Sequence, residues 1–262
     1  MTSVPHLPLM VWDFREQLQA TSKQVVNNGG TPETTYYVYD ATGQRVRKVT
    51  EREAGSGQTP ARKEERIYSG TFEIYRKFEN TGVTLERETL HIMDDKQRLA
   101  IVETRTEGDD SSPAQVIRYQ FSNQIESASL EVDEAGQIIS YEEYYPYGST
   151  SYQAGRSAVE VSLKRYRFVG KERDEETGLN YHGARYYAPW LARWTSADPA
   201  GIADGPNAYQ YSLSSPIVRF DAKGTDSDRT FNLGLRRDDS GLLFYPGHSL
   251  ELNRDLTTLG FG

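Results

Sequence analysis

The sequence contains no cysteine, which excludes disulfide bonds, thiolate nucleophiles and cysteine-ligated zinc. Histidine is scarce as well, and the four histidines lack the spacing of zinc-binding motifs, so each is better explained as a structural residue. We therefore expect no metal site and no cofactor, with stability supplied by packing alone. This suits a chain made in a reducing cytosol. The histidines are His6, His91, His182 and His248.

Long hydrophobic runs are also missing. No stretch of about 18 apolar residues is present, and the N-terminus lacks the basic and apolar regions of a signal peptide. Acidic residues outnumber basic ones by 38 to 30, giving a net charge of −8 without a basic stripe. We therefore expect no nucleic-acid binding and no direct membrane insertion.

Aromatic residues are plentiful, with 18 Tyr and 9 Phe, and they alternate with polar residues at the period of a β-strand. One hairpin is predicted over residues 35–49 around a turn at 40–43. A second is predicted over 129–141 around a turn at 133–136. Each turn begins with Asp, which can accept backbone amides, and ends with Gly, which tolerates positive φ.

Other alternating segments predict more strands, separated by polar loops that we expect at hairpin tips. Because such units bury their apolar faces only against their neighbours, a continuous antiparallel sheet is expected. A short helix is plausible at 207–211. The strand segments are 63–78, 85–93, 99–106 and 116–121, and the loops are 53–60 and 107–113.

From residue 144 onward, distinct motifs replace the alternating pattern. Residues 144–148 read YYPYG, 168–181 read FVGKERDEETGLNY, and 183–189 read GARYYAP. Two D-x-x-G turns follow, which begin at Asp198 and Asp221, 23 residues apart, with Arg185 13 residues before the first. Chance and composition rarely produce this combination.

These motifs resemble the Rhs-repeat-associated core of bacterial Rhs/YD-repeat toxins. Upstream, PHLPLMVWDF at 5–14, YVYDATGQR at 37–45 and MDDKQR at 93–98 are similar to the C component of insecticidal Tc toxin complexes. The resemblance covers roughly residues 5 to 225. It implies a mainly β fold in which a YD-repeat antiparallel sheet forms part of a hollow shell, with an inward-curling core.

The resemblance also implies an organisation along the chain. Residues 1–143 would be the shell segment and 144–225 the core. Residues 226–262 would be the start or remnant of a hypervariable effector region, and these 37 residues are too few for an enzyme with its own core.

The chemistry implied by the resemblance is a single self-cleavage in cis. Asp198 and Asp221 would form an aspartyl dyad, because two adjacent carboxylates share a proton so that one serves as acid and the other as base. Arg185 would either hold one carboxylate ionised or stabilise the oxyanion. The scissile bond would join Thr225 and Asp226, held close to the dyad by the short connection. The turns are formed with Pro199, Gly201 and Gly224.

A purely structural role for the two aspartates stays open, because Asp in a D-x-x-G turn is an ordinary turn former. The chain would then be a non-enzymatic shell or binding module for glycans or a partner, or a displaced cassette end that folds poorly. Ala222 stands where the family often has proline, and Ile202 and Thr225 stand where it has leucine, which bears on cleavage efficiency. The acidic cluster Asp174, Glu175 and Glu176 is expected to be solvated.

The partners implied by the resemblance are a B-type Tc subunit or the remaining Rhs shell, and the chain's own C-terminal effector segment. The protein would be made in the bacterial cytoplasm and secreted as part of a toxin complex, although this chain carries no signal peptide of its own.

Overall fold

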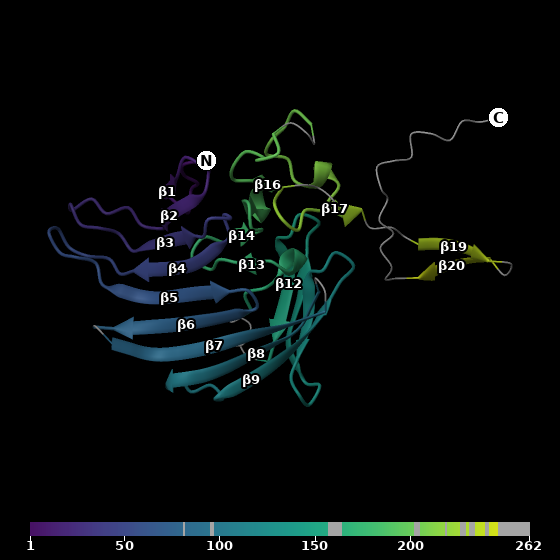
Figure 1. The fold of residues 1–262 in the computed structure, drawn as a ribbon, viewed down its shortest axis with the longest axis horizontal. Helices are drawn as coiled ribbons and strands as arrows, with labels where there is room; N and C mark the ends of the chain where they lie inside the picture. Colours follow the sequence, from purple (N-terminus) through teal and green to yellow (C-terminus); the bar gives the residue numbers. More distant parts are fainter. Residues whose placement is uncertain are drawn as a thin grey trace.

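The computed structural model describes residues 1–80, 82–94, 97–156, 164–201, 205–217, 219–225, 229–230, 234–238 and 241–245. In these residues, twelve strands form one antiparallel sheet in chain order, so each strand pairs with its neighbours in sequence. The sheet curls around one side of the molecule (Figure 1). The predicted mainly β class is thereby confirmed.

The strands of this large sheet are β1 Leu9–Trp12, β2 Leu18–Ser22, β3 Thr34–Tyr39, β4 Arg45–Glu51, β5 Arg62–Ser69, β6 Phe72–Glu79, β7 Gly82–Asp94, β8 Gln97–Gly108, β9 Gln115–Ser122, β10 Ala128–Val132, β11 Ile138–Tyr144 and β12 Thr150–Gly155. Both predicted hairpins are present as β3–β4 and β10–β11. The predicted loops lie between β4 and β5 and between β8 and β9. The large sheet runs on to Gly155, whereas the domain boundary after residue 143 stays a prediction.

A small second sheet follows, and it lies on the inner side of the curl (Figure 1). Its four strands are β13 Glu172–Arg173, β14 Asn180–Tyr181, β15 Tyr186–Ala188 and β16 Arg193–Trp194. Short 3-10 turns flank these strands at η1 Phe168–Gly170, η2 Pro189–Leu191 and η3 Ser212–Ser214. The remaining strands form two pairs, β17 Arg219–Phe220 with β18 Arg229–Thr230, and β19 Gly234–Asp238 with β20 Gly241–Tyr245.

One kind of turn recurs at four hairpin tips of the large sheet. The side-chain Oδ1 of its first residue accepts the amide N–H groups two and four residues further on, at 2.8 to 3.1 Å. The fourth residue has positive φ, which is why Gly fits at two of the tips. The turns begin at Asp13, Asp40, Asn123 and Asp133.

Two hydrophobic clusters lie on opposite faces of β15. Tyr186 packs with Leu18 and Tyr37 of the large sheet, whereas Tyr187 packs with Trp194 and other residues of the C-terminal segments. Successive residues of a strand point to opposite faces, so β15 can join both clusters at once. The small sheet is thus anchored from both sides.

The helix expected at 207–211 is wrong. Asn207 forms a turn instead, because its side-chain Oδ1 accepts the Tyr209 amide at 3.2 Å and its carbonyl accepts the Gln210 amide at 3.0 Å. Gln210 then bridges to Arg193. Asn competes for backbone amides in this way and therefore favours turns over helices.

Candidate active site

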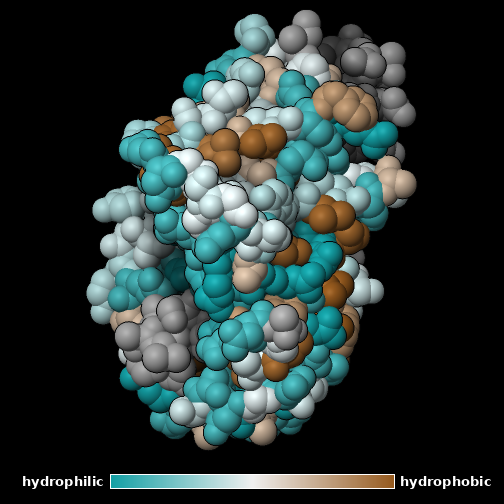
Figure 2. Space-filling view, turned by 90° about the vertical axis from the view of Figure 1, so that its left-hand side faces the viewer, coloured by the Kyte–Doolittle hydropathy of each residue, from teal (hydrophilic) through white to brown (hydrophobic). Residues whose placement is uncertain are grey.

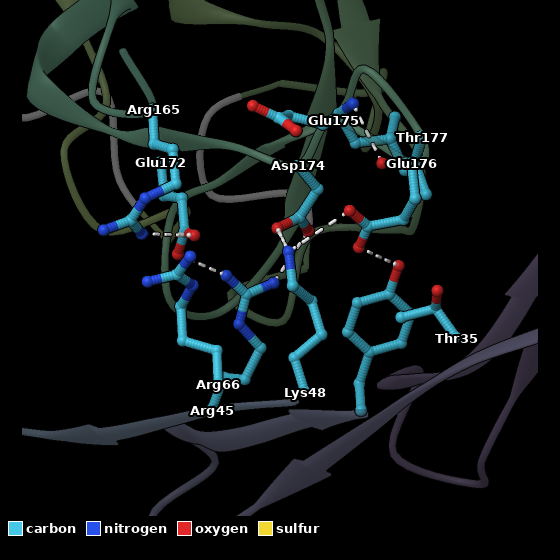
Figure 3. A network of polar contacts seen from close by, with 12 residues as sticks. Thr35, Arg45, Lys48, Arg66, Arg165, Glu172, Asp174, Glu175, Glu176 and Thr177 are labelled. Carbon is cyan, nitrogen blue, oxygen red and sulfur yellow. Dashed lines mark hydrogen bonds and ion pairs between the residues drawn. The ribbon is translucent and has the colours of Figure 1, made fainter. Parts of the chain in front are cut away.

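Buried ion pairs join β4 of the large sheet to residues 172–176 beside the small sheet, and we call this set of ion pairs the ionic seam. In β4, Arg45 donates to Glu172 at 2.6 Å and to Asp174 at 2.7 Å, and Lys48 reaches Asp174 at 2.9 Å and Glu176 at 3.2 Å (Figure 3). Burial alone would raise the pKa of Glu172, but Arg45, Lys48 and other cations outweigh it and lower that pKa to about 2.

The expectation that the acidic cluster is solvated is therefore wrong for two of its three members. Asp174 is fully buried and Glu176 is half-buried, while Glu175 is exposed. The reason is that β4 supplies two cations from more than 120 residues earlier in the chain. The seam sets the orientation of the segment that carries the candidate catalytic residues.

Arg185, Asp198 and Asp221 meet in one buried place. Nη2 of Arg185 lies 2.7 Å from Oδ2 of Asp198 and 3.3 Å from Oδ2 of Asp221. Asp198 follows β16, Asp221 directly follows β17, and Arg185 immediately precedes β15, so the ends of three short strands bring them together. The two carboxylates share one guanidinium nitrogen, and their role as a catalytic dyad stays a prediction.

Every nitrogen of the guanidinium has a partner. Besides the two carboxylates on Nη2, Nε donates to the carbonyl of Gly224 at 2.6 Å and Nη1 donates to the carbonyl of Ala208 at 3.3 Å. The guanidinium also lies 4.2 Å from the centre of the Trp194 ring, a cation–π contact. The structure thus shows Arg185 ion-paired with both carboxylates, and an oxyanion role for it stays a prediction.

Both aspartates begin turns that share one feature with the hairpin tips, because Oδ1 accepts the amide two residues further on. Oδ1 of Asp221 accepts the amides of Lys223 at 3.0 Å and Gly224 at 2.6 Å. Oδ1 of Asp198 accepts the amide of Ala200 at 2.8 Å. The turn residues Gly201 and Gly224 have φ of 76° and 75°, as the motif predicts, and Pro199 lies inside the first turn.

Burial gives the two charged partners unusual acidities. The pKa of Asp221 is raised above its ordinary value because burial disfavours its charge more than the Gly224 amide and Arg185 favour it. Burial also lowers the pKa of Arg185, against the pull of both carboxylates. Burial at this site therefore disfavours the charged form of both Asp221 and Arg185.

A small cavity of about 10 Å³ lies between these groups. Arg185, Trp194, Asp198 and Asp221 are among the residues that line it. This is room for about one water molecule. An acid, a base and a place for water are the components needed to hydrolyse a peptide bond.

The structure describes only the N-terminal side of the predicted cleavage site. Thr225 ends a described segment directly after the Asp221 turn, and Asp226 lies outside the described residues. The carbonyl of Gly224, one residue before Thr225, is the backbone group held by Arg185.

Sequence reasoning missed two side chains at the site. Trp194 covers the guanidinium of Arg185, and nothing in its sequence context indicates this. His182, assigned a structural role, is buried, and its Nδ1 lies 2.7 Å from the carbonyl oxygen of Asp221. Its position three residues before Arg185 was the available hint.

The described part of the chain offers neither a metal site nor a membrane-spanning helix. No group of three or more His, Asp or Glu side chains there is arranged to hold a metal ion. No helix among those residues is long and apolar enough to cross a membrane. Figure 2 shows one side of the molecule, where hydrophobic groups are separated by hydrophilic ones.

No family model matches the chain. The toxin subunit YenC1 of Yersinia entomophaga is 39% identical over 217 residues, which are 81% of this chain and 22% of that protein. The toxin protein Tse5 of Pseudomonas aeruginosa is 47% identical over 58 residues, or 22% of this chain and 4% of that protein. This chain thus spans about a fifth of the length of YenC1.

Solved structures match this chain with sequence identities of about a third. The crystal structure of TcdB2-TccC3 has a TM-score of 0.76 and 33% identity, covering 84% of this chain and 10% of that one. A structure of the Photorhabdus luminescens Tc holotoxin pore has a TM-score of 0.75 and 30% identity, covering 94% and 11%. The likeness therefore extends over both sheets described above.

Proposed function

Because the chain belongs to the Rhs/YD-repeat toxin family, among the relatives of Tc toxin C components, we propose that it is the C-terminal part of a toxin subunit that encloses an effector and releases it by aspartyl self-cleavage after Thr225. The observation that carries the proposal is the pair of carboxylates on one nitrogen of Arg185, next to the chain that leads into Thr225.

The roles of the two aspartates follow from their surroundings. Asp198 lies closer to the cation and serves as the base: it takes a proton from water, whose oxygen attacks the carbonyl carbon of Thr225. Asp221, whose pKa is raised by burial, serves as the acid and gives its proton to the amide nitrogen of Asp226 as the C–N bond breaks. The products are a carboxyl group on Thr225 and an amine on Asp226.

Enclosure of an effector is supported by the curled sheet. A cavity of about 630 Å³ lies between the inner face of the large sheet and the small sheet. Most of the residues that line it are acidic, basic or uncharged polar residues. By analogy with TcdB2-TccC3, the partner that completes the shell would be a B-type subunit, and the assembled toxin would be secreted.

The test is intact mass spectrometry of freshly purified protein beside the Asp198→Asn and Asp221→Asn variants. The wild type is expected to yield fragments 1–225 and 226–262, while both variants remain whole with unchanged circular dichroism. Full-length protein in all three samples would overturn the proposal.

That outcome would favour a second candidate, a non-enzymatic YD-repeat shell or binding module whose dyad is vestigial. One observation supports this candidate: Oδ1 of Asp198 and of Asp221 accepts the amide two residues further on, as the Oδ1 atoms of Asp40 and Asp133 do at two hairpin tips.

A further inference from the structure

Two segments of the core are joined by three hydrogen bonds to backbone carbonyls between Asp221 and Gly224. Nδ1 of His182 bonds the carbonyl of Asp221 at 2.7 Å, the amide of Ala184 donates to the carbonyl of Lys223 at 3.0 Å, and Nε of Arg185 donates to the carbonyl of Gly224 at 2.6 Å. We call His182, Ala184 and Arg185 the register clamp. It fixes the position of the backbone from Asp221 to Gly224 relative to the dyad, and thereby the position of Thr225, the next residue.

His182 is built to act as a donor in this clamp. Burial lowers its pKa to about 3, so the ring is neutral at ordinary pH and carries a single N–H. A carbonyl oxygen can only accept, so this proton must lie on Nδ1. The ring also packs edge-on against Trp194, with centroids 5.1 Å apart, which holds it in place beneath the dyad.

Gly224 allows the two segments to approach this closely. A Cβ at this position would lie 3.0 Å from the amide nitrogen of Arg185 and 3.5 Å from Cβ of His182. Its φ of 75° is also unfavourable for other residues. The clamp therefore depends on backbone geometry on both sides.

All three acceptors of the clamp are backbone carbonyls, which are the same whatever side chains follow them. We propose that the register clamp, with His182 as its positioning residue, selects the scissile bond by its distance along the chain from Asp221, rather than by recognition of the side chains of Thr225 and Asp226. The inference rests on the proposed function and adds to it how the bond is chosen.

Insertions test the selection directly and leave the buried site untouched. With one alanine inserted after Thr225, the cut is expected to stay after Thr225, so the inserted residue starts the released fragment. With one alanine inserted after Gly224, the cut is expected after the inserted alanine, so Thr225 starts the released fragment. Thr225→Leu should leave the cut where it is. Two results would overturn the clamp. One is a cut directly after Thr225 in the variant with alanine after Gly224, and the other is a cut directly before Asp226 in the variant with alanine after Thr225.

A matched pair of substitutions tests His182. His182→Phe keeps a ring for packing but removes the donor, and cleavage should slow by about 10²-fold, because a small misplacement of a reacting group has that cost. His182→Asn returns an N–H close to the position of Nδ1 and should restore most of the rate. His6→Phe is the control and should cleave like the wild type, because the contacts of His6 are with Thr177 and Trp190 and not with the dyad.

The outcomes separate the two proposals. If the wild type cleaves, Asp198→Asn does not, and His182→Phe cleaves at the wild-type rate and bond, the clamp is wrong and the aspartyl self-cleavage stands. If the wild type itself is never cleaved, both are wrong. Restoration by His182→Asn is the readout that loss of fold stability alone would not produce.

Discussion

Asp40 at a hairpin tip and Asp221 in the core begin turns held by the same kind of bond, from backbone amides to Oδ1. Their acidities nevertheless move in opposite directions. Asp40 is exposed, and bonds from the Thr42 hydroxyl and from backbone amides lower its pKa. Asp221 is buried against Arg185, and burial raises its pKa. The turn places the carboxylate, and its surroundings decide whether it can act as an acid.

The comparison extends to the second oxygen of each side chain. At the hairpin turn of Asp133, Oδ2 pairs with Arg156 at the surface. In the core, the Oδ2 atoms of Asp198 and Asp221 converge on one buried guanidinium. Convergence and burial therefore distinguish a candidate dyad from a set of ordinary turns.

The largest expected effect separates the two classes of aspartate. Asp221→Asn should slow cleavage by at least about 10²-fold to 10⁴-fold, the usual contribution of a general acid. Asp40→Asn, at an exposed tip, should leave the rate unchanged. Time-resolved intact mass spectrometry measures both, and an equal loss in the two variants would mean that cleavage reports only on turn stability.

The second effect concerns the seam that buries the core. Arg45→Ala removes the cation that the buried carboxylates of Glu172 and Asp174 share, and leaves them with Arg165 and Lys48 alone. It should lower the free energy of unfolding by up to about 3 to 5 kcal/mol. Arg47→Ala, two residues along the same strand and 37% exposed, should cost less than about 1 kcal/mol. Urea unfolding of both variants checks this, and similar losses would contradict the buried seam.

The third effect is on pH dependence. The acid acts only while Asp221 is protonated, and its pKa is raised above the ordinary value of 3.8. The cleavage rate should therefore fall as the pH rises through that raised pKa, by about tenfold per pH unit beyond it. Rates measured from about pH 4 to about pH 8 give the profile. A rate that increases with pH across this range would refute Asp221 as the acid.

The smallest effect compares two glycines with nearly the same φ, 72° at Gly136 and 75° at Gly224. Gly136→Ala meets open space, so it should cost only the backbone strain, about 1 to 2 kcal/mol. Gly224→Ala adds a contact with the backbone of Arg185 and should cost more, as well as slowing cleavage. Thermal unfolding and cleavage assays on both variants measure this, and equal losses of stability would argue against the close approach.

Much of the sheet could be predicted from the sequence because its hairpins are local. Alternation and the D-x-x-G turns at Asp40 and Asp133 predict strands that pair with their neighbours in the chain. The turns at Asp13 and Asn123 were not predicted, because Glu16 and Glu126 occupy their positive-φ position in place of glycine.

The candidate site was predicted from motifs, whereas its surroundings were not. Arg185, Asp198 and Asp221 stand in recognisable motifs, and they come together as expected. The environment of Asp174 was misjudged because its partners Arg45 and Lys48 lie far away in sequence. Trp194 and His182 likewise act through packing and backbone contacts that no local pattern encodes.

We propose that water, activated at the dyad, hydrolyses the bond between Thr225 and Asp226. Purified protein left to cleave in heavy-oxygen water, and then analysed by mass spectrometry, shows whether water supplies the new oxygen atom. We expect an N-terminal fragment that ends at Thr225 and whose new carboxyl group carries one heavy oxygen atom, and we expect none of this fragment from Asp198→Asn. An unlabelled fragment, a different C-terminus or intact wild-type protein would contradict it.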